Sequence, residues 1–316
     1  MVPSAHPKVF AVLIVLNSSC HVTAQALADP VDHPLIAFES ADFCEDGPWH
    51  LVYEDEFNDD TLDTDHWLRF FPYCINGDEC QVSRKHGGED ELQIFEDANV
   101  QFTGNGIVKL IVKRSDTLVY CYSYSSHYTA ALLHSRMKFH RGRFECRCKV
   151  PYSNSNWIWP SFWLFGGPGA CSEIDILEIP GDRSDRYHHA LHRYNYECNG
   201  NHANDEDTHT LMDLSNDFHV YRADWDKWFI NFYVDDQLIY RSCRIYDLLD
   251  RPVSSCYIHE GVYIQNQAFP AQDAYMSIIV GVGIHNSGLN DAHGPGPPVP
   301  NIPCALEVDW IRVYQR

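Results

Sequence analysis

The amino-acid sequence predicts an all-β fold, a sandwich or a barrel, and three observations support this prediction. Short runs in which apolar and polar residues alternate recur along the chain, and clusters of turn-forming residues separate them. Helical periodicity is almost absent after residue 26. No internal repeat or linker divides the chain, and 316 residues with 45% hydrophobic content are enough for one large core. Short strands at this spacing are typical of sandwiches and barrels.

The expected strands follow from this alternation along the chain. GRFECRCKV at 142–150 alternates throughout, which indicates an antiparallel strand with one buried face. Within the run 229–240, Val234-Asp235-Asp236 separates two strand-like halves and predicts a tight hairpin. The Pro/Gly-rich stretch 293–303 leads directly into the last strand, so we expect a surface loop there. Strands are expected at 51–57, 106–114, 131–139, 142–150, 161–166, 218–225, 229–240, 276–284 and 305–314.

The N-terminal residues predict a signal peptide. Lys8 precedes an apolar run from Val9 to Leu16, which is too short to span a bilayer, and Ala24-Gln25-Ala26 is a small-x-small cleavage site. We therefore expect a signal peptide at 1–26, an N-terminal arm at 27–48 and a single domain at 49–316. The alternative is lipoprotein processing at Cys20, which would anchor the protein to lipid. No transmembrane segment is expected elsewhere, so the protein is expected to be secreted.

The composition is strongly acidic, with a formal net charge of −21. A surface of this charge repels nucleic acid, anionic lipid and, on average, sulphated polysaccharide. A neutral partner fits it better, although the stretch RMKFHRGR at 136–143 is locally basic. We therefore expect no nucleic-acid partner, and we expect a monomer.

Twelve cysteines are many for a cytosolic enzyme and fit an exported chain in which several are oxidised. Cys74 and Cys80 flank a short polar loop and are the best expected disulfide. Cys146 and Cys148 share one strand face, where they are expected to be small buried residues or bridges to a neighbouring strand. Because Cys20 leaves with the signal peptide, the mature chain has an odd number of cysteines. This predicts at least one free thiol or an intermolecular bond.

The stretch SEIDILEIPG at 172–181 has the composition of a strand, but its alternation slips. Glu173 and Asp175 fall on one face, whereas Glu178 falls where an apolar residue is due. One extra residue in a strand makes a β-bulge, and residues beyond the bulge change faces. A bulge near Ile176-Leu177 would return Glu178 to the face of the other two carboxylates, with the isoleucines of the stretch packed inward.

Three carboxylates on one strand face have a chemical use. Retaining glycosidases need two carboxyl groups roughly 5–5.5 Å apart, one ionised and one protonated. Crowding raises the pKa of at least one of them, since like charges oppose ionisation. The alternative is a solvated acidic strand. The aromatic residues Trp157, Trp159 and Trp163 just upstream favour a glycan cleft, because such rings can stack on sugars, although each could instead pack in the core.

These residues resemble glycoside hydrolase family 16. EIDILE at 173–178 is similar to its E-x-D-x-x-E active-site pattern in the longer, bulged form, and WPSFWLFG at 159–166 is similar to its W-P-A-F-W-L segment. The similarity extends over most of the mature chain, through 51–67, 90–114, 128–151, 218–240 and 307–316. The resemblance implies an antiparallel β-sandwich, a concanavalin-like β-jelly roll, with a concave glycan cleft and retaining endo-hydrolysis.

The resemblance also implies roles for single residues. By motif position, Glu173 is the nucleophile, Asp175 is its assisting acid and Glu178 is the general acid/base. No cofactor is required for such a reaction. The resemblance further implies substrate binding by Trp159, Trp163, His192 and Asp90, and a structural calcium ion at Glu56, Gly106 and Asp309.

The bulged motif is typical of β-1,3-glucanases (laminarinases), and also of agarases and carrageenases. The chain departs from the family at Asp90, where Asn is common, at Ala131-Leu132, which replace a Gly-Arg or Gly-Lys, and at Arg193, where laminarinases often have an aromatic residue. We expect a polysaccharide substrate, with a neutral β-1,3-glucan first. The alternatives are hydrolysis of another β-glycan, such as an agar- or carrageenan-type galactan, and a non-catalytic glucan-binding lectin on the same scaffold.

Overall fold

The structure, a computed structural model, describes most of the chain after residue 46. The predicted signal peptide and the predicted disulfide partners Cys74 and Cys80 lie outside the described residues. No helix in the described part of the chain has the length and apolar character that a bilayer span needs. The described residues are 35–38, 41–42, 47–73, 84–85, 91–121, 124–152, 158–179, 183–194, 203–249, 251–253, 257–258, 261–285 and 302–316, with 35–38, 41–42 and 257–258 described by their backbone alone.

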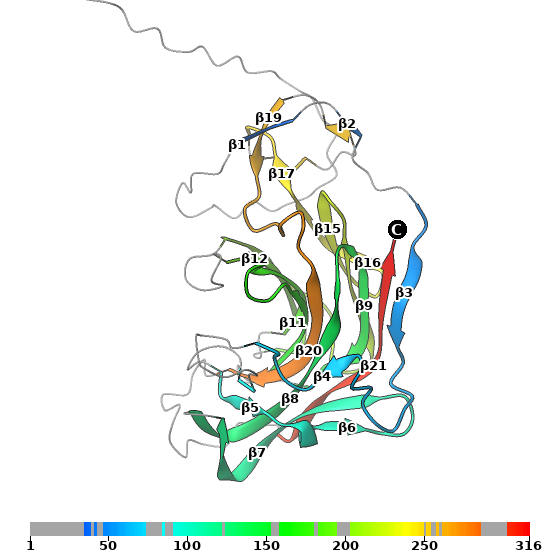
Figure 1. The fold of residues 1–316 in the computed structure, drawn as a ribbon, viewed down its shortest axis with the longest axis vertical. Helices are drawn as coiled ribbons and strands as arrows, with labels where there is room; N and C mark the ends of the chain where they lie inside the picture. The colour runs from blue at the N-terminus through cyan, green and yellow to red at the C-terminus, as the bar shows by residue number, and fades with distance from the viewer. Residues whose placement is uncertain are drawn as a thin grey trace, which may run out of the picture.

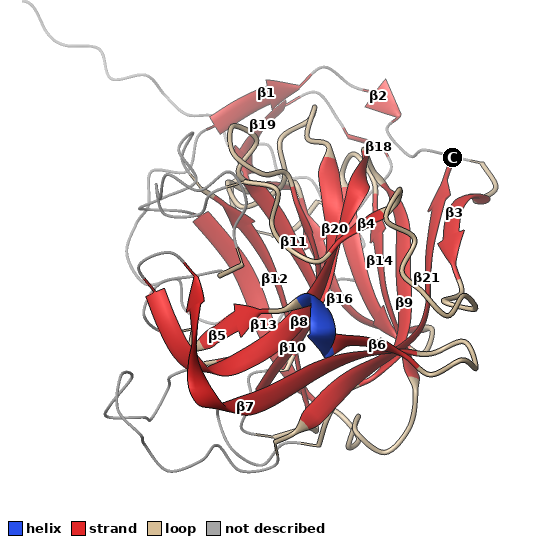
Figure 2. Ribbon diagram, turned by 60° about the horizontal axis from the view of Figure 1, so that its bottom comes forward, coloured by secondary structure: helices blue, strands red, loops and turns tan. Residues whose placement is uncertain are grey.

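One large, almost entirely antiparallel sheet folds back on itself to make two layers (Figures 1 and 2). The first layer, here called the site sheet, has the strand order β13 (Ala203–Thr210), β12 (Arg186–Arg193), β11 (Ser172–Glu178), β10 (Ile158–Phe165), β20 (Met276–Ile284) and β8 (Tyr124–Phe139). The second layer, the outer sheet, continues with β7 (Val108–Cys121), β21 (Cys304–Gln315), β9 (Gly142–Lys149), β14 (His219–Trp225), β15 (Phe229–Val234) and β16 (Gln237–Cys243).

Short elements complete the two layers. β3 (His50–Asp55) pairs with β21, β6 (Val100–Phe102) pairs with β7, and β4 (Trp67–Leu68) pairs with β8. β5 (Gln93–Phe95) pairs with β8 in parallel, and the 3-10 turn η1 (Asp97–Asn99) follows it. Because β7 pairs with both β8 and β21, the long β7–β8 hairpin joins the two layers at one edge.

The core lies between the two layers, where alternating side chains of both sheets meet. Tyr187 of β12 stacks on Tyr221 of β14 with ring centroids 6.2 Å apart, and Phe139 of β8 meets the edge of Phe144 of β9. Side chains of this size contribute roughly 1.5–3 kcal/mol each when fully buried. The predicted all-β sandwich is therefore confirmed, and the nine expected strand regions all contain strands.

Two local predictions are also confirmed. Asp235 and Asp236 have φ of 49° and 63°, which is the backbone of a type I′ turn between β15 and β16. Aspartate tolerates this left-handed region better than most residues do. Cys146 and Cys148 are buried, free thiols, so of the two expectations for them the small buried residue is correct.

The opposite edges of the two sheets are tied together by a partly buried polar network around Asp205 of β13. Its carboxylate accepts hydrogen bonds from the Tyr240 hydroxyl at 2.9 Å and from the Asn266 amide at 2.9 Å, and also from the Ser242 hydroxyl. Tyr240 and Ser242 belong to β16, the last strand of the outer sheet. The network therefore anchors β13, which the sequence did not reveal as a strand.

A second, smaller group of strands lies at one end of the molecule (Figure 1). β1 (Leu35–Phe38), β19 (Gly261–Gln265) and β17 (Ile245–Tyr246) form a three-stranded sheet, and β2 (Ala41–Asp42) pairs with β18 (Tyr257–Ile258). Ile245 of β17 and Tyr263 of β19 belong to a separate apolar cluster that also includes Trp228. Part of the expected N-terminal arm is thus paired with the segment that follows β16.

Candidate active site

Strand β11 carries the predicted bulge. Against β10, Leu177 pairs with Phe162 and Asp175 pairs with Trp163, so Ile176 is an extra residue. Against β12 the register shifts in the same place, between Asp175 and Glu178. The bulge is confirmed at the position where the sequence pattern slipped.

The bulge frees a backbone carbonyl, and a buried tyrosine satisfies it. The Tyr187 hydroxyl donates a hydrogen bond of 2.7 Å to the carbonyl oxygen of Ile176. Tyr187 has no exposed surface, and burial raises its pKa, so the hydroxyl remains a donor at any ordinary pH. Tyr187 therefore supports the backbone between Asp175 and Glu178.

Replacing Tyr187 with phenylalanine is expected to destabilise the protein by about 1–3 kcal/mol, because the Ile176 carbonyl would be left buried without a partner. The matched control is Tyr120→Phe, which removes the hydroxyl of a side chain that is 69% exposed and should change little. Guanidinium unfolding of both variants measures the difference. Equal stability of the two variants would show that the hydroxyl does not support the bulge.

The three carboxylates line one pocket of the site sheet. Glu173, Asp175 and Glu178 face a cavity that Trp159 and Trp163 of β10 also line. Its other walls come from the β5 segment, β8 and β20, and include Glu91, Gln93, Leu132, Gly281, Gly283 and His285. The isoleucines Ile174, Ile176 and Ile179 are fully buried, as the bulge predicts.

Glu173 lies at the start of β11, among other carboxyl groups. Burial raises its pKa well above the ordinary 4.5, and the charges of Asp175 and Glu178 raise it further. The Tyr194 hydroxyl donates a hydrogen bond to Glu173, which favours the ionised form. Tyr73 lies close enough to Glu173 to be affected by its charge. Burial raises the pKa of Tyr73, and the Glu173 charge raises it further. The crowding keeps the carboxyls from all being ionised together.

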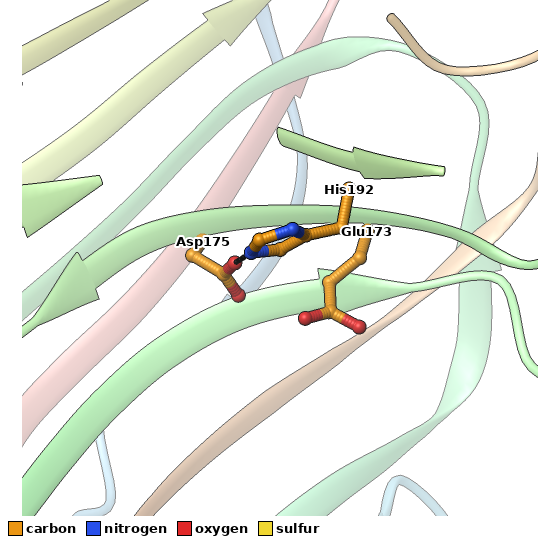
Figure 3. A group of neighbouring side chains, drawn as sticks. All are labelled: Glu173, Asp175 and His192. Atoms are coloured by element: carbon orange, nitrogen blue, oxygen red, sulfur yellow. Dashed lines mark ion pairs between the residues drawn. The ribbon is translucent and has the colours of Figure 1, made fainter. Parts of the chain in front are cut away.

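Asp175 forms an ion pair with His192 of the neighbouring strand β12. His192 Nε2 lies 3.3 Å from Asp175 Oδ2, and Figure 3 shows the imidazole reaching over the carboxylate beside Glu173. Burial lowers the pKa of His192, but the hydrogen bond and charge of Asp175 outweigh it, so the net shift is upward. The ligand atoms of Glu173, Asp175 and His192 lie within 4.8 Å of one another, so their donor set could also accept a metal ion.

Glu178 lies at the other end of β11, and its two oxygens have different neighbours. The Trp159 indole donates a hydrogen bond of 2.8 Å to Oε1, while His188 Nε2 lies 3.7 Å from Oε2. Burial raises the pKa of Glu178 well above 4.5, and the charge of Asp175 raises it further. The hydrogen bond from Trp159 acts in the opposite direction but does not outweigh them. A carboxyl in this setting can hold a proton at neutral pH, as a general acid must.

The structure places only some of the predicted substrate-binding residues at the pocket. Trp159 binds Glu178 through its indole nitrogen, and its ring lies 5.3 Å from that of His285. Trp163 lines the pocket but is only 7% exposed, and it packs against Phe71 and Phe165, so core packing and pocket lining both apply to it. Trp157 and Asp90 lie outside the described residues.

Sequence reasoning missed several residues of the site. Glu91 lines the pocket and accepts a hydrogen bond of 2.6 Å from the Gln93 amide, whose oxygen in turn accepts the Ile284 backbone N–H. The signal for these two was available in the E-L-Q segment. His188 and Tyr194 come from β12 and the residue after it, in a stretch that did not read as a strand.

The residues predicted to bind calcium lie away from this pocket. The Glu56 carboxylate pairs with Arg312 at 2.7 Å, and the Asp309 carboxylate pairs with Arg147. Gly106 has φ of 79° and lies beside the backbone carbonyl of Glu56. The structure brings Glu56 and Gly106 together, while each carboxylate already has an arginine partner. The calcium site stays a prediction.

Comparison with known proteins gives a consistent result. The family model described as glycosyl hydrolases family 16 matches residues 88–272. The glucan endo-1,3-beta-glucosidase A1 of Niallia circulans is 25% identical over 281 residues, which are 84% of this chain and 38% of that relative, so this chain spans well under half of its length. The glucan endo-1,3-beta-glucosidase of Cryptopygus antarcticus is 28% identical over 203 residues, covering 61% of this chain and 68% of the relative.

Solved structures show that the fold is shared. The laminarinase catalytic domain from Thermotoga maritima superposes with a TM-score of 0.63 at 24% identity, covering 85% of this chain and 99% of that chain. This likeness supports the jelly-roll architecture.

Proposed function

Because the chain belongs to glycosyl hydrolases family 16, we propose that it is a retaining endo-glycosidase that hydrolyses β-1,3-glucan by double displacement. The observation that carries the proposal is the bulged strand β11, which presents Glu173, Asp175 and Glu178 to one pocket. The intact trio argues against a non-catalytic lectin. No cofactor is needed, because the carboxyl groups supply both the nucleophile and the proton.

The roles of the carboxyl groups follow from the family motif. Glu178 gives its proton to the glycosidic oxygen as the bond from that oxygen to C1 breaks, and the Glu173 carboxylate forms a bond to C1. Water then attacks C1, Glu178 takes a proton from the water, and Glu173 leaves. The ion pair with His192 holds Asp175 beside the nucleophile Glu173.

The electrostatics of the pocket support a neutral substrate. Glu91 adds a fourth acidic side chain to the pocket, and Glu206 lies beside His188 at its margin. Carboxylates at this density repel a sulphated chain over short distances as well as through the net charge of −21. Arg193, which lies opposite Ser172 at the end of β12, is a cationic residue next to the site.

The substrate assignment predicts that kcat/KM on laminarin exceeds kcat/KM on agarose or carrageenan at the same ionic strength. The measurement is initial-rate hydrolysis of each polymer with analysis of the products. Lichenan and xylan in the same panel test the linkage. A laminarin-to-galactan ratio below one would reject the glucan assignment and leave the fold and the double displacement in place.

We also propose that the protein is exported. The predicted signal peptide at 1–26 supports this, and so does the disulfide in which Cys171 takes part, because such bonds persist in oxidising compartments.

A further inference from the structure

His188 lies between two carboxylates on the site sheet. It belongs to β12 and pairs with Glu178 of β11 on one side and with Thr208 of β13 on the other. Its Nε2 atom is 3.7 Å from Glu178 Oε2 and 3.8 Å from Glu206 Oε2. Its side chain is 17% exposed. The ring therefore separates the expected general acid from a second acidic residue on the edge strand.

The other ring nitrogen fixes which atom faces the acids. His188 Nδ1 lies 2.8 Å from the Thr208 hydroxyl oxygen. A threonine hydroxyl can donate to Nδ1, which leaves the single ring proton on Nε2, and both carboxylates attract a proton there. We assign this tautomer to His188 because Nε2 faces two acids and Nδ1 faces a hydroxyl.

The two oxygens of Glu178 then have different tasks. Oε1 accepts the Trp159 indole N–H, and an indole can only donate. The transferable proton therefore sits on Oε2, the oxygen that faces His188. When this proton leaves, the new negative charge develops 3.7 Å from His188 Nε2.

We propose that His188 is a positioning residue for Glu178. The Nε2–H of His188 stabilises the carboxylate that forms when Glu178 gives its proton to the leaving oxygen. The Thr208 hydroxyl holds the ring in this orientation. The proposal rests on the proposed hydrolysis for the reaction it serves. The ring proton stays on His188 throughout, so the proton balance of the double displacement is unchanged.

The charges around His188 fit a neutral imidazole. Burial lowers the pKa of His188, and the charge of His192 on the same strand lowers it further. The charges of Glu206, Asp175 and Asp207 raise this pKa, but the net shift is downward. A neutral donor stabilises a carboxylate without removing the proton beforehand, whereas an imidazolium would ionise Glu178 too early.

The charges that face Glu178 itself define the test. Asp175, Glu206 and Glu91 raise its pKa after burial has done so, and the Trp159 bond lowers it. Glu206 therefore acts on Glu178 in the opposite sense to a donor on His188. Changes at positions 188 and 206 should move the same titration in opposite directions.

The experiment compares the variants His188→Leu, His188→Gln and Glu206→Gln with the unaltered chain. The basic limb of the kcat/KM profile on laminarin reports the pKa of the acid in the free enzyme. We expect His188→Leu to move this limb up by about 0.5–1 pH unit with roughly tenfold lower kcat, because ionised Glu178 loses its donor. His188→Gln keeps an N–H, so it should restore part of the kcat and part of the original position of the limb. Glu206→Gln should move the limb to lower pH.

A purely structural role for His188 predicts a different outcome. It would lower the melting temperature and kcat of His188→Leu without moving the limb, or it would move the limb of His188→Leu and Glu206→Gln in the same direction. Either result overturns the proposal. Direct titration of the Glu178 carboxyl by ¹³C NMR gives the same shifts without substrate. If no glycan is cleaved, the proposed function fails, and the NMR titration still decides the role of His188.

Discussion

Glu173→Ala is expected to lower kcat/KM on laminarin by about three orders of magnitude or more, because the covalent intermediate of the proposed mechanism forms on this carboxylate. Sodium azide should restore part of the rate. It can enter the space left by the carboxyl and attack C1 from the nucleophile side, so the product should be a glycosyl azide of inverted configuration, identified by NMR.

The control for Glu173→Ala is Glu307→Gln, which removes a carboxylate that pairs with Lys109 on the outer sheet. It should retain full activity. Near-normal turnover by Glu173→Ala would remove this residue from the mechanism. The variant should also resist denaturation better at neutral pH. Burial raises the pKa of Glu173 above its ordinary 4.5 in the folded protein, so ionisation of this group costs stability as the pH rises, and the variant lacks that cost.

Glu178→Ala is expected to lose a similar factor on laminarin but much less on aryl glycosides with good leaving groups. Such leaving groups depart without a proton, so only the second step, in which Glu178 acts as base, stays slow. Azide should accelerate this step as well, since it needs no base. The product should be a glycosyl azide of retained configuration.

The two variants together test the division of roles. If the aryl glycosides also spared Glu173→Ala, or if both variants gave azides of one configuration, the assignments of nucleophile and acid/base would be reversed or wrong. A burst of released aryl group from Glu178→Ala would show that the intermediate accumulates, as the scheme requires.

Much of the fold could be predicted because period-two alternation depends on burial of one strand face. The strand at 142–150 alternates without fault, and in the structure its faces alternate between buried and half-buried. The bulge could also be predicted, because without it the Glu178 carboxylate would lie on the apolar face of the strand. Burial of the carboxylate there is unfavourable, and a bulge moves it to the other face. The sequence therefore located the most important irregularity of the sheet.

Strands β12 and β13 could not be predicted by the same argument. β13 reads ANDEDTHT and has almost no apolar residue, because its inward face is satisfied by the hydrogen bonds of Asp205 instead of by hydrophobic packing. In β12, His189 is fully buried and stacks on Phe232 and Tyr240, so a residue that usually indicates a polar face lies in the core. Strands of this kind depend on partners distant in sequence.

Some residues of the site could be predicted from the sequence and others could not. Glu173, Asp175, Glu178 and Trp159 lie on strands with a recognisable motif. His188 and Tyr194 reach the pocket from a strand whose pattern gives no warning, and their roles depend on a register that only the structure provides.

The pairing of β1 with β19 joins two segments that lie more than 200 residues apart in sequence, and it therefore bears on the order of folding. Leu35–Phe38 align with residues 261–264, whereas the β7–β8 hairpin and the β14–β15–β16 meander use neighbours close in sequence. Closing so large a loop is slow, so we expect the local hairpins to form before the arm pairs. Contacts made after the transition state set how fast a protein unfolds, not how fast it folds. We therefore expect the arm to affect the lifetime of the folded protein more than its rate of folding.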